Sequence, residues 1–125
     1  MNFDPCTLFW KGYSLQSYDL VAPQHLRLRL QVDSVAFCSV CQQSCLQVHD
    51  TVLRQVRDCD LLDYRLSLIV PVRRVNCPDC GRQNEHIDWL SKHQRMTDRL
   101  VKHTEDLCRI LPIKHVAEHL KLSWH

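Results

Sequence analysis

Two closely spaced cysteine pairs constrain this chain more than any other feature. They are C-S-V-C at Cys38–Cys41 and C-P-D-C at Cys77–Cys80. In a C-x-x-C segment a tight turn aims two thiolates at one ion and leaves backbone N–H groups free to hydrogen-bond the sulfurs. Two such pairs complete a tetrahedral site of four sulfurs, which suits Zn²⁺ and leaves no coordination position for water. The spacing therefore predicts one structural zinc ion bound by Cys38, Cys41, Cys77 and Cys80, with residues 42–76 inserted between the two knuckles.

Other uses of the cysteines stay open from the sequence alone. Iron–sulfur ligation is the main rival for the same four thiols, and a disulfide framework is the other, because the total of eight cysteines is even. Cys45 and His49 could form an alternative half-site with Cys41. His86 and His93 could be extra ligands, but four sulfurs already fill the site, so we expect them at the surface. The cysteines without partner spacing are expected in the core or at the surface, with Cys108 in the core: Cys6, Cys59 and Cys108.

Three segments between residues 25 and 76 have the pattern of β-strands. His25–Asp33 alternates apolar residues with Arg27, Arg29 and Gln31, which is typical of a strand with one buried face. Its arginines are expected either on a solvated face or in contact with phosphate. Thr51–Arg57 alternates less cleanly, and Tyr64–Val75 is rich in β-branched residues. Because Pro71 cannot donate a ladder hydrogen bond, we expect the Tyr64–Val75 strand to be an edge strand or to carry a bulge there.

The pattern changes to helical spacing in the last third of the chain. Apolar residues recur at helical intervals from Thr97 to Pro112, with Thr97 or Asp98 as the expected N-cap. A second apolar stripe recurs at i, i+3, i+4 and i+7 from Ile113 to Leu120. Ser123 is a good N-cap for a third helix, but the chain ends at His125, too soon to form it. The sequence therefore predicts two short helices at the C-terminal end.

Charge and hydropathy narrow the function classes. The net charge is +2, but residues 91–125 hold seven basic and four acidic residues. No apolar run approaches the roughly 18 residues needed to cross a bilayer, and the N-terminus lacks a secretory pattern, so we expect a cytoplasmic protein without membrane contact. No pair of carboxylates, activated nucleophile or glycine-rich phosphate loop is recognisable. An enzyme is therefore the least favoured class.

Several motifs resemble the N-terminal region of the ISL-three family of insertion-sequence transposases. They are V-H-D at Val48–Asp50, R-x-x-R-D at Arg54–Asp58, V-R-R-V-N-C-P-D-C-G at Val72–Gly81 and V-A-E-H-L-K-L-S-W at Val116–Trp124. The resemblance covers roughly residues 25–125. It implies a zinc ribbon and a helix-turn-helix that recognise the element's terminal inverted repeats. In the family an RNase-H-like catalytic domain follows; here the chain stops at His125, so we expect a DNA-recognition region that does not catalyse transposition.

The sequence and the resemblance together predict an α+β fold in three parts. Residues 1–24 form an N-terminal cap strand region, with one short helix near Thr7–Tyr13. Residues 25–90 form the zinc ribbon, and residues 91–125 form a truncated helix-turn-helix whose direct base readout should be poor. A helical hairpin that only covers the ribbon is the alternative for the last part.

The expected partner is double-stranded DNA at the bacterial nucleoid. Phosphate contacts come mainly from arginine and lysine. The candidates are Arg54, Arg57, Arg73, Arg74, Lys92, Arg95, Arg99, Lys114 and Lys121. Arg73 and Arg74, beside the second knuckle, are the first choice, whereas Arg57 could instead form an internal salt bridge with Asp58. The alternative function is a protein-interaction or self-association module.

Overall fold

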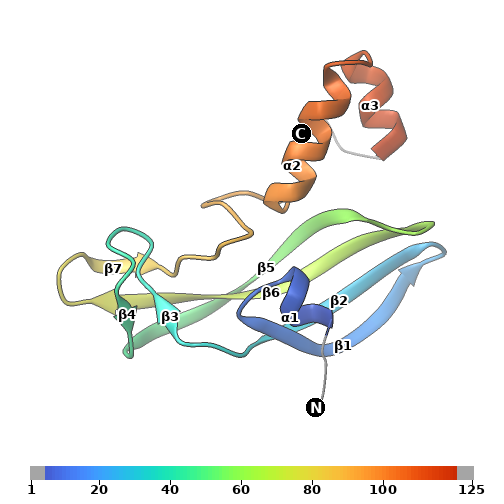
Figure 1. The fold of residues 1–125 in the computed structure, drawn as a ribbon. Coiled ribbons are helices and arrows are strands. Elements are labelled where there is room, and N and C mark those ends of the chain that lie inside the picture. Colours follow the sequence, from blue (N-terminus) through green and yellow to red (C-terminus); the bar gives the residue numbers. More distant parts are fainter. Residues whose placement is uncertain (1–4, 121–125) are drawn as a thin grey trace.

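The structure is a computed structural model that describes residues 5–120, with side chains described from residue 7 onward. In chain order its elements are α1 (Pro5–Phe9), β1 (Tyr13–Ala22), β2 (His25–Val32), β3 (Ala36–Phe37), β4 (Ser44–Cys45), β5 (Val48–Leu61), β6 (Tyr64–Cys77), β7 (Gly81–Asn84), α2 (Asp98–Cys108) and α3 (Ile113–Leu120). Figure 1 shows a sheet of long strands, a smaller end where β3, β4 and β7 gather, and a hairpin of α2 and α3 that stands away from the sheet. Strands make up most of the regular secondary structure in residues 5–120, with a few short helices, in agreement with the predicted α+β class.

The main sheet has the strand order β1-β2-β6-β5, and β7 pairs with the far end of β6. The β2–β6 pair is parallel, and the pairs β1–β2, β5–β6 and β6–β7 are antiparallel. β6 therefore pairs with three strands and is the centre of the sheet. The predicted strands at His25–Asp33 and Tyr64–Val75 are confirmed as β2 and β6, and Thr51–Arg57 lies within the longer β5.

The prediction for Pro71 is wrong for the strand as a whole, because β6 is central and its register with β5 runs through Pro71 without a bulge. Around the proline itself, however, β6 is paired on one side only, as an edge strand is. On the side away from β5, pairing with β2 ends at Ile69 and pairing with β7 begins at Arg74. The missing N–H of Pro71 faces this gap, where its carbonyl accepts a hydrogen bond of 2.9 Å from the Tyr13 hydroxyl. A proline is tolerated in a central strand here because no neighbouring strand needs its N–H.

One face of the sheet forms the core. Alternate residues of β2 and β6 point to the same face of a sheet, so the apolar positions of both strands gather there. The buried core residues are Trp10, Tyr13, Leu28, Leu30, Val56, Leu66, Leu68, Val70, Val72 and Leu90. Burying a side chain such as Leu68 contributes about 1.5–3 kcal/mol. The period-two pattern of the sequence is thus explained by a sheet with one apolar face.

The N-terminal helix lies earlier than predicted. We expected it near Thr7–Tyr13, but α1 ends at Phe9 and Tyr13 already begins β1. Gly12 has φ = 91°, a left-handed conformation that suits glycine, and it ends the turn in which the Tyr13 N–H donates to the Trp10 carbonyl. Trp10 and Tyr13 are therefore directed into the core rather than along a helix.

A buried carboxylate joins the sheet to both ends of the chain. Asp58 of β5 is 1% exposed. It accepts hydrogen bonds from Trp10 Nε1 (2.8 Å), Thr97 Oγ1 (2.7 Å), Arg99 Nε and Nη2 (2.9 and 2.8 Å) and the Cys59 N–H (2.7 Å). Since Thr97 and Arg99 begin the helical hairpin, Asp58 fixes where α2 leaves the sheet.

The helical hairpin follows most of the predicted pattern. Thr97 is the N-cap of α2, and its hydroxyl accepts from the Leu100 N–H at 3.4 Å. Leu100 of α2 and two residues of α3 are buried, Val116 and Leu120. Cys108 is exposed, which corrects its predicted core position, because α2 buries only its first turn against β5. The predicted N-cap at Ser123 lies outside the described residues. No helix within residues 5–120 is both long and apolar enough to cross a bilayer.

Candidate metal centre and nucleic-acid interface

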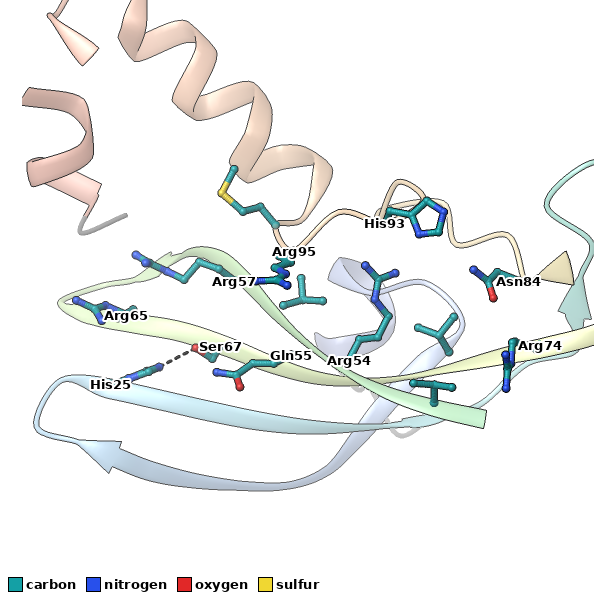
Figure 2. A pocket seen from close by; sticks show the side chains of 14 residues that line it. His25, Arg54, Gln55, Arg57, Arg65, Ser67, Arg74, Asn84, His93 and Arg95 are labelled. Atoms are coloured by element: carbon teal, nitrogen blue, oxygen red, sulfur yellow. Dashed lines mark hydrogen bonds between the residues drawn. The ribbon is translucent and has the colours of Figure 1, made fainter. Parts of the chain in front are cut away.

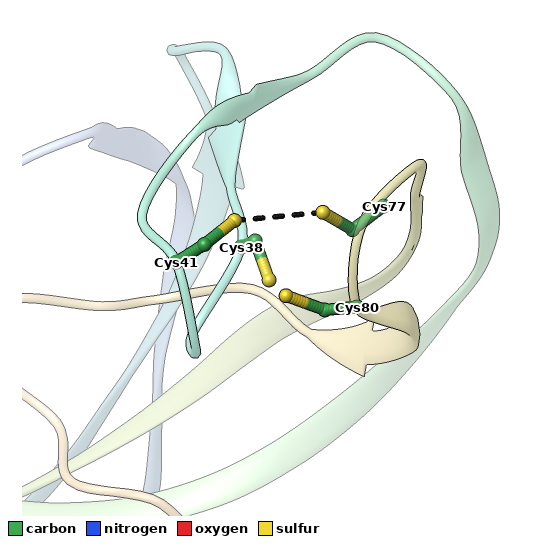
Figure 3. A group of neighbouring side chains, drawn as sticks. All are labelled: Cys38, Cys41, Cys77 and Cys80. Carbon is green, nitrogen blue, oxygen red and sulfur yellow. Dashed lines mark hydrogen bonds between the residues drawn. The ribbon is translucent and has the colours of Figure 1, made fainter.

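The four predicted cysteine ligands come together at the end of β6. Cys38 and Cys41 lie in the turn between β3 and β4, and Cys77 and Cys80 lie at the turn from β6 to β7. Their sulfur atoms all lie within 4.8 Å of one another, and Cys41 Sγ is 3.5 Å from Cys77 Sγ. Figure 3 shows the four thiols converging from the two turns. Sulfurs around a tetrahedral ion at 2.3 Å are about 3.8 Å apart, so the cluster has the dimensions of a zinc site.

Local backbone geometry explains why each turn aims two sulfurs at one point. Gly81 has φ = 78°, the left-handed conformation expected after the second pair, and Gln42 has φ = 62° after the first. In the first knuckle the Cys38 N–H donates to the Gln43 carbonyl, and the Gln42 N–H donates to the Cys38 carbonyl. The Val40 N–H donates to Cys38 Sγ at 3.4 Å. The backbone conformation of each turn therefore helps to direct its thiols toward one point.

The electrostatics of the cluster favour some thiolates more than others. Hydrogen bonds from the backbone N–H groups of Cys41 and Val40 lower the pKa of Cys38 to about 7. The N–H groups of Asp79 and Cys80 likewise lower the pKa of Cys77. Burial raises the pKa of Cys80 to about 12, which a bound divalent cation would oppose because it stabilises thiolates. In each knuckle, backbone N–H groups thus lower the pKa of one thiol, Cys38 or Cys77.

The alternative ligands do not join this cluster. Within residues 5–120, no other group of cysteine, histidine or acidic side chains gathers closely enough to hold a metal ion. Cys45 is buried beside the cluster with its thiol directed at the Gln43 carbonyl, whereas His49 is exposed. His86 pairs with Asp88 at 2.9 Å. The described cysteines are all free thiols, so the disulfide alternative finds no support among them.

The basic residues of the ribbon gather in a second site, a groove on the β5–β6 hairpin. Five arginines line it, Arg54, Arg57, Arg65, Arg74 and Arg95. The other lining residues are His25, Val52, Gln55, Val56, Ser67, Val72, Asn84, His93 and Met96. Figure 2 shows the strands below and the linker with His93 and Arg95 above. We call this surface the arginine groove; it contains no aspartate or glutamate among its lining residues.

Four of the nine predicted DNA contacts therefore lie in the arginine groove: Arg54, Arg57, Arg74 and Arg95. Their hydrogen bonds differ. Arg54 donates to the Gln94 carbonyl (2.5 Å), Arg74 pairs with Asp50, and Arg57 pairs with Asp60 (3.0 Å). The internal salt bridge considered between Arg57 and Asp58 is not formed. Asp58 pairs with Arg99, and Arg57 pairs with Asp60.

The other predicted contacts lie outside the groove. Arg73, one of the two first choices, has a 13% exposed side chain that pairs bidentately with Glu85 and donates to the Ser34 carbonyl at 2.8 Å. Arg99 pairs with Asp58 at 2.8 Å. Lys92 and Lys114 are exposed on the linker and on α3, and Lys121 lies outside the described residues.

The sequence did not point to Arg65, His25 or Ser67 as members of a site. His25 Nε2 lies 2.7 Å from the Ser67 hydroxyl, and His25 pairs in register with Arg65 across β2 and β6. These residues are far apart in the sequence, and the parallel pairing of β2 with β6 brings them together. One signal for these residues is present in the sequence: each alternates with the apolar residues of its strand, which places it on the face of the sheet away from the core.

Comparisons with known proteins match both parts of the chain. Residues 34–87 match a family model described as the zinc-finger of transposase IS204/IS1001/IS1096/IS1165. Residues 85–125 match the helix-turn-helix domain of transposase family ISL3. The chain belongs to the ISL3 transposase family.

One curated relative extends this match over nearly the whole chain. The transposase for insertion sequence element IS1001 of Bordetella parapertussis is 34% identical over an alignment of 120 residues, and the match covers 93% of this ISL3 chain and 30% of the relative. The chain thus spans less than a third of that relative's length. No solved structure matches it significantly. The zinc-finger match contains all four clustered cysteines, and the helix-turn-helix match contains α2 and α3.

Proposed function

We propose that this chain is the DNA-recognition region of an ISL3 transposase, which binds duplex DNA at the terminal inverted repeats of its element. The zinc ion is structural: four thiolates close its coordination sphere, so it holds the two knuckles together and takes no part in catalysis. The proposed place of action is the bacterial nucleoid.

The arginine groove carries this proposal. It presents five guanidinium groups and two imidazoles with no carboxylate in its lining. Guanidinium groups bind phosphate oxygens bidentately, and contacts to phosphate supply most of the affinity of proteins for DNA. The groove lies between the ribbon and the linker to the helical hairpin, so a duplex bound there would also be near α2 and α3.

A salt titration of DNA binding tests the proposal. Zinc-loaded protein is mixed with an inverted-repeat duplex and with a scrambled duplex, and the dissociation constants are measured at increasing salt. We expect log K to fall linearly with log salt, with a slope that is smaller by about 1.8 for the variant Arg54→Ala plus Arg95→Ala, because each lost phosphate contact removes about 0.9. The control is Lys11→Ala, a lysine paired with Asp88 away from the groove. Binding that does not change with salt would contradict the proposal.

Self-association is the second candidate, and one feature favours it. The turn of the helical hairpin exposes three large apolar side chains, Ile110 (75%), Leu111 (39%) and Ile113 (58%). Apolar surface of this kind is often covered by a partner. Sedimentation of the chain without DNA distinguishes the two functions: a dimer that resists high salt and causes no DNA shift would favour self-association.

A further inference from the structure

The arginine groove shares five residues with the face of the sheet opposite the core, and the basic surface continues across that face to two further arginines of β2. In β2, Leu28 and Leu30 are buried in the core, so Arg27 and Arg29 lie on the opposite face. The same alternation places Arg65 and Ser67 of β6 on the face opposite to that of Leu66 and Leu68. We define the outer face by the polar residues His25, Arg27, Arg29, Gln55, Arg57, Arg65 and Ser67.

Strand register arranges these residues in rows. Ser67 of β6 lies between Arg27 of β2 and Arg57 of β5. The next row toward β7 brings Arg29 and Gln55 to either side of Ile69. Neighbouring strands are about 4.8 Å apart and alternate residues of a strand about 6.7 Å apart, so the rows form a lattice about 10 Å wide and 13 Å long. Four arginines and one histidine stand on this small area.

Carboxylates neutralise only part of this charge. Arg27 pairs with Asp19 of β1 (2.9 Å), and Arg57 pairs with Asp60 (3.0 Å). Within residues 5–120, neither Arg29 nor Arg65 forms a salt bridge, although both side chains are partly buried by their neighbours. The charges of these two guanidinium groups are therefore not neutralised by a neighbouring carboxylate.

The histidine at the edge of the lattice reports the resulting positive field. Burial and the charges of Arg65, Arg57 and Arg27 lower the pKa of His25, which keeps the imidazole neutral. The neutral ring and the Ser67 hydroxyl share a hydrogen bond of 2.7 Å. Figure 2 shows His25, Ser67, Arg65 and Arg57 together at one end of the groove. The outer face is thus a cluster of like charges whose mutual repulsion an anion would relieve.

We propose that the outer face binds the sugar-phosphate backbone of duplex DNA as a sequence-independent clamp, an inference that rests on the proposed function. Arginine forks suit phosphate oxygens, and the exposed Gln55 side chain adds an uncharged donor of the kind that contacts backbone phosphates. A face 13 Å long spans about four phosphates of one strand, at 3.4 Å each along the axis.

The clamp and the helices contact different stretches of the same duplex. The linker is fixed to the free edge of β5 where the Arg57 N–H donates to the Arg95 carbonyl (2.8 Å) and the Thr97 N–H donates to the Arg57 carbonyl (3.0 Å). α2 begins directly after this contact and leads away from the sheet (Figure 1). The outer face therefore holds DNA while the helical hairpin occupies a neighbouring position.

The decisive variant removes the two unpaired arginines, Arg29→Ala plus Arg65→Ala, in the zinc-loaded full chain. Anisotropy of labelled inverted-repeat and scrambled duplexes gives the dissociation constants between about 50 and 200 mM salt. We expect the salt slope to fall by about 1.8, so that over this range the unmodified chain loses about twelve times more affinity than the variant. The loss should be the same for both duplexes.

Two matched variants keep the test independent of folding. Arg29→Lys plus Arg65→Lys retains both charges and should keep the salt slope of the unmodified chain. Asp19→Asn removes the carboxylate that neutralises Arg27 and should raise the affinity for both duplexes. If the alanine variant does not fold, as judged by its circular dichroism and zinc content, these two variants decide the question.

The outcomes separate this inference from the proposed function. An unchanged slope in the alanine variant, a loss confined to the inverted repeat, or a weaker Asp19→Asn variant overturns the clamp while DNA binding by the chain stands. If the unmodified chain shows no salt-dependent binding to either duplex, the proposed function fails and the clamp fails with it.

Discussion

Replacing Asp58 with asparagine removes the charge on which the junction of sheet, N-terminal turn and helical hairpin depends. The carboxylate is 1% exposed and accepts from Trp10, Thr97, Arg99 and the Cys59 N–H. An asparagine has the same shape, but one of its two terminal atoms is an NH₂ group that faces these donors. Several donors would then lose their acceptor, and Arg99 would lose its counter-ion.

The expected cost follows from burial. Removing one partner of a buried ion pair costs about 3–5 kcal/mol, because the other charge is left uncompensated. The Arg99 side chain is 40% exposed and can be partly hydrated after the change, so we expect the lower end, about 3 kcal/mol. For a domain of this size 1 kcal/mol shifts Tm by about 3–4 °C, which predicts a loss of roughly 10 °C.

The assay is thermal and urea unfolding of zinc-loaded protein followed by circular dichroism, with Arg99→Lys as a milder comparison that keeps the charge. A double-mutant cycle with Trp10→Phe, which removes only the indole N–H, tests whether the hydrogen bond itself is lost. We expect the effects of Trp10→Phe and Asp58→Asn to be non-additive, since both remove the same bond. An Asp58→Asn protein that melts within about 2 °C of the unmodified chain would refute this reasoning.

Acid should abolish the difference between the two proteins. Burial raises the pKa of Asp58, but hydrogen bonds from Arg99, Thr97 and Trp10 outweigh it and hold the pKa below its ordinary value. The stability that this group contributes is therefore complete above the unfolded-state pKa of about 3.9 and is lost as the pH falls through the lower folded-state value. Asp58→Asn cannot titrate, so the gap in unfolding free energy should be constant near neutral pH and should close below about pH 4. A gap that widens in acid would contradict the assigned sign.

Three further outcomes follow from the structure. Cys80→Ser should lower the zinc content from one ion per chain to none, whereas Cys45→Ser should keep the ion; native mass spectrometry decides, and zinc loss in the Cys45 variant would reassign the ligands. Arg73→Ala should cost about 3 kcal/mol in urea unfolding, because it leaves the buried Glu85 carboxylate without its partner, yet it should hardly change the salt slope of DNA binding. A large change in that slope would instead indicate that Arg73 contacts DNA. Leu68→Ala should cost about 2–5 kcal/mol because Leu68 is fully buried in β6, and a cost under 1 kcal/mol would contradict its place in the core.

The features that the sequence predicted correctly depend on local pattern. Alternation in His25–Asp33 and the β-branched run at Tyr64–Val75 identified two strands, because a sheet with one apolar face imposes period two on each strand. The two C-x-x-C turns converge as expected, since each turn orients its own pair of thiols. The N-cap at Thr97 likewise depends on the residues next to it.

The features that the sequence could not predict depend on pairing between distant segments. Arg65 and His25 become neighbours only through the parallel register of β2 with β6, and no local pattern encodes that register. The sequence suggested Asp58 as a salt-bridge partner of Arg57, and its role comes from donors that lie far away in the chain. Cys108 was wrongly placed in the core because helical spacing indicates which face is apolar, but not how far a covering element extends.

The gap beside Pro71 bears on how this protein avoids aggregation. A stretch of strand with free backbone groups is a template for edge-to-edge pairing with another chain. Here each exposed backbone position on that side is already occupied or absent: proline has no amide hydrogen, Tyr13 covers its carbonyl, and the Arg73 N–H donates to the Glu85 carboxylate at 2.7 Å. The interruption between β2 and β7 is thereby closed to an invading strand, and the central strand of the sheet can be left without a neighbour there at little risk of polymerisation.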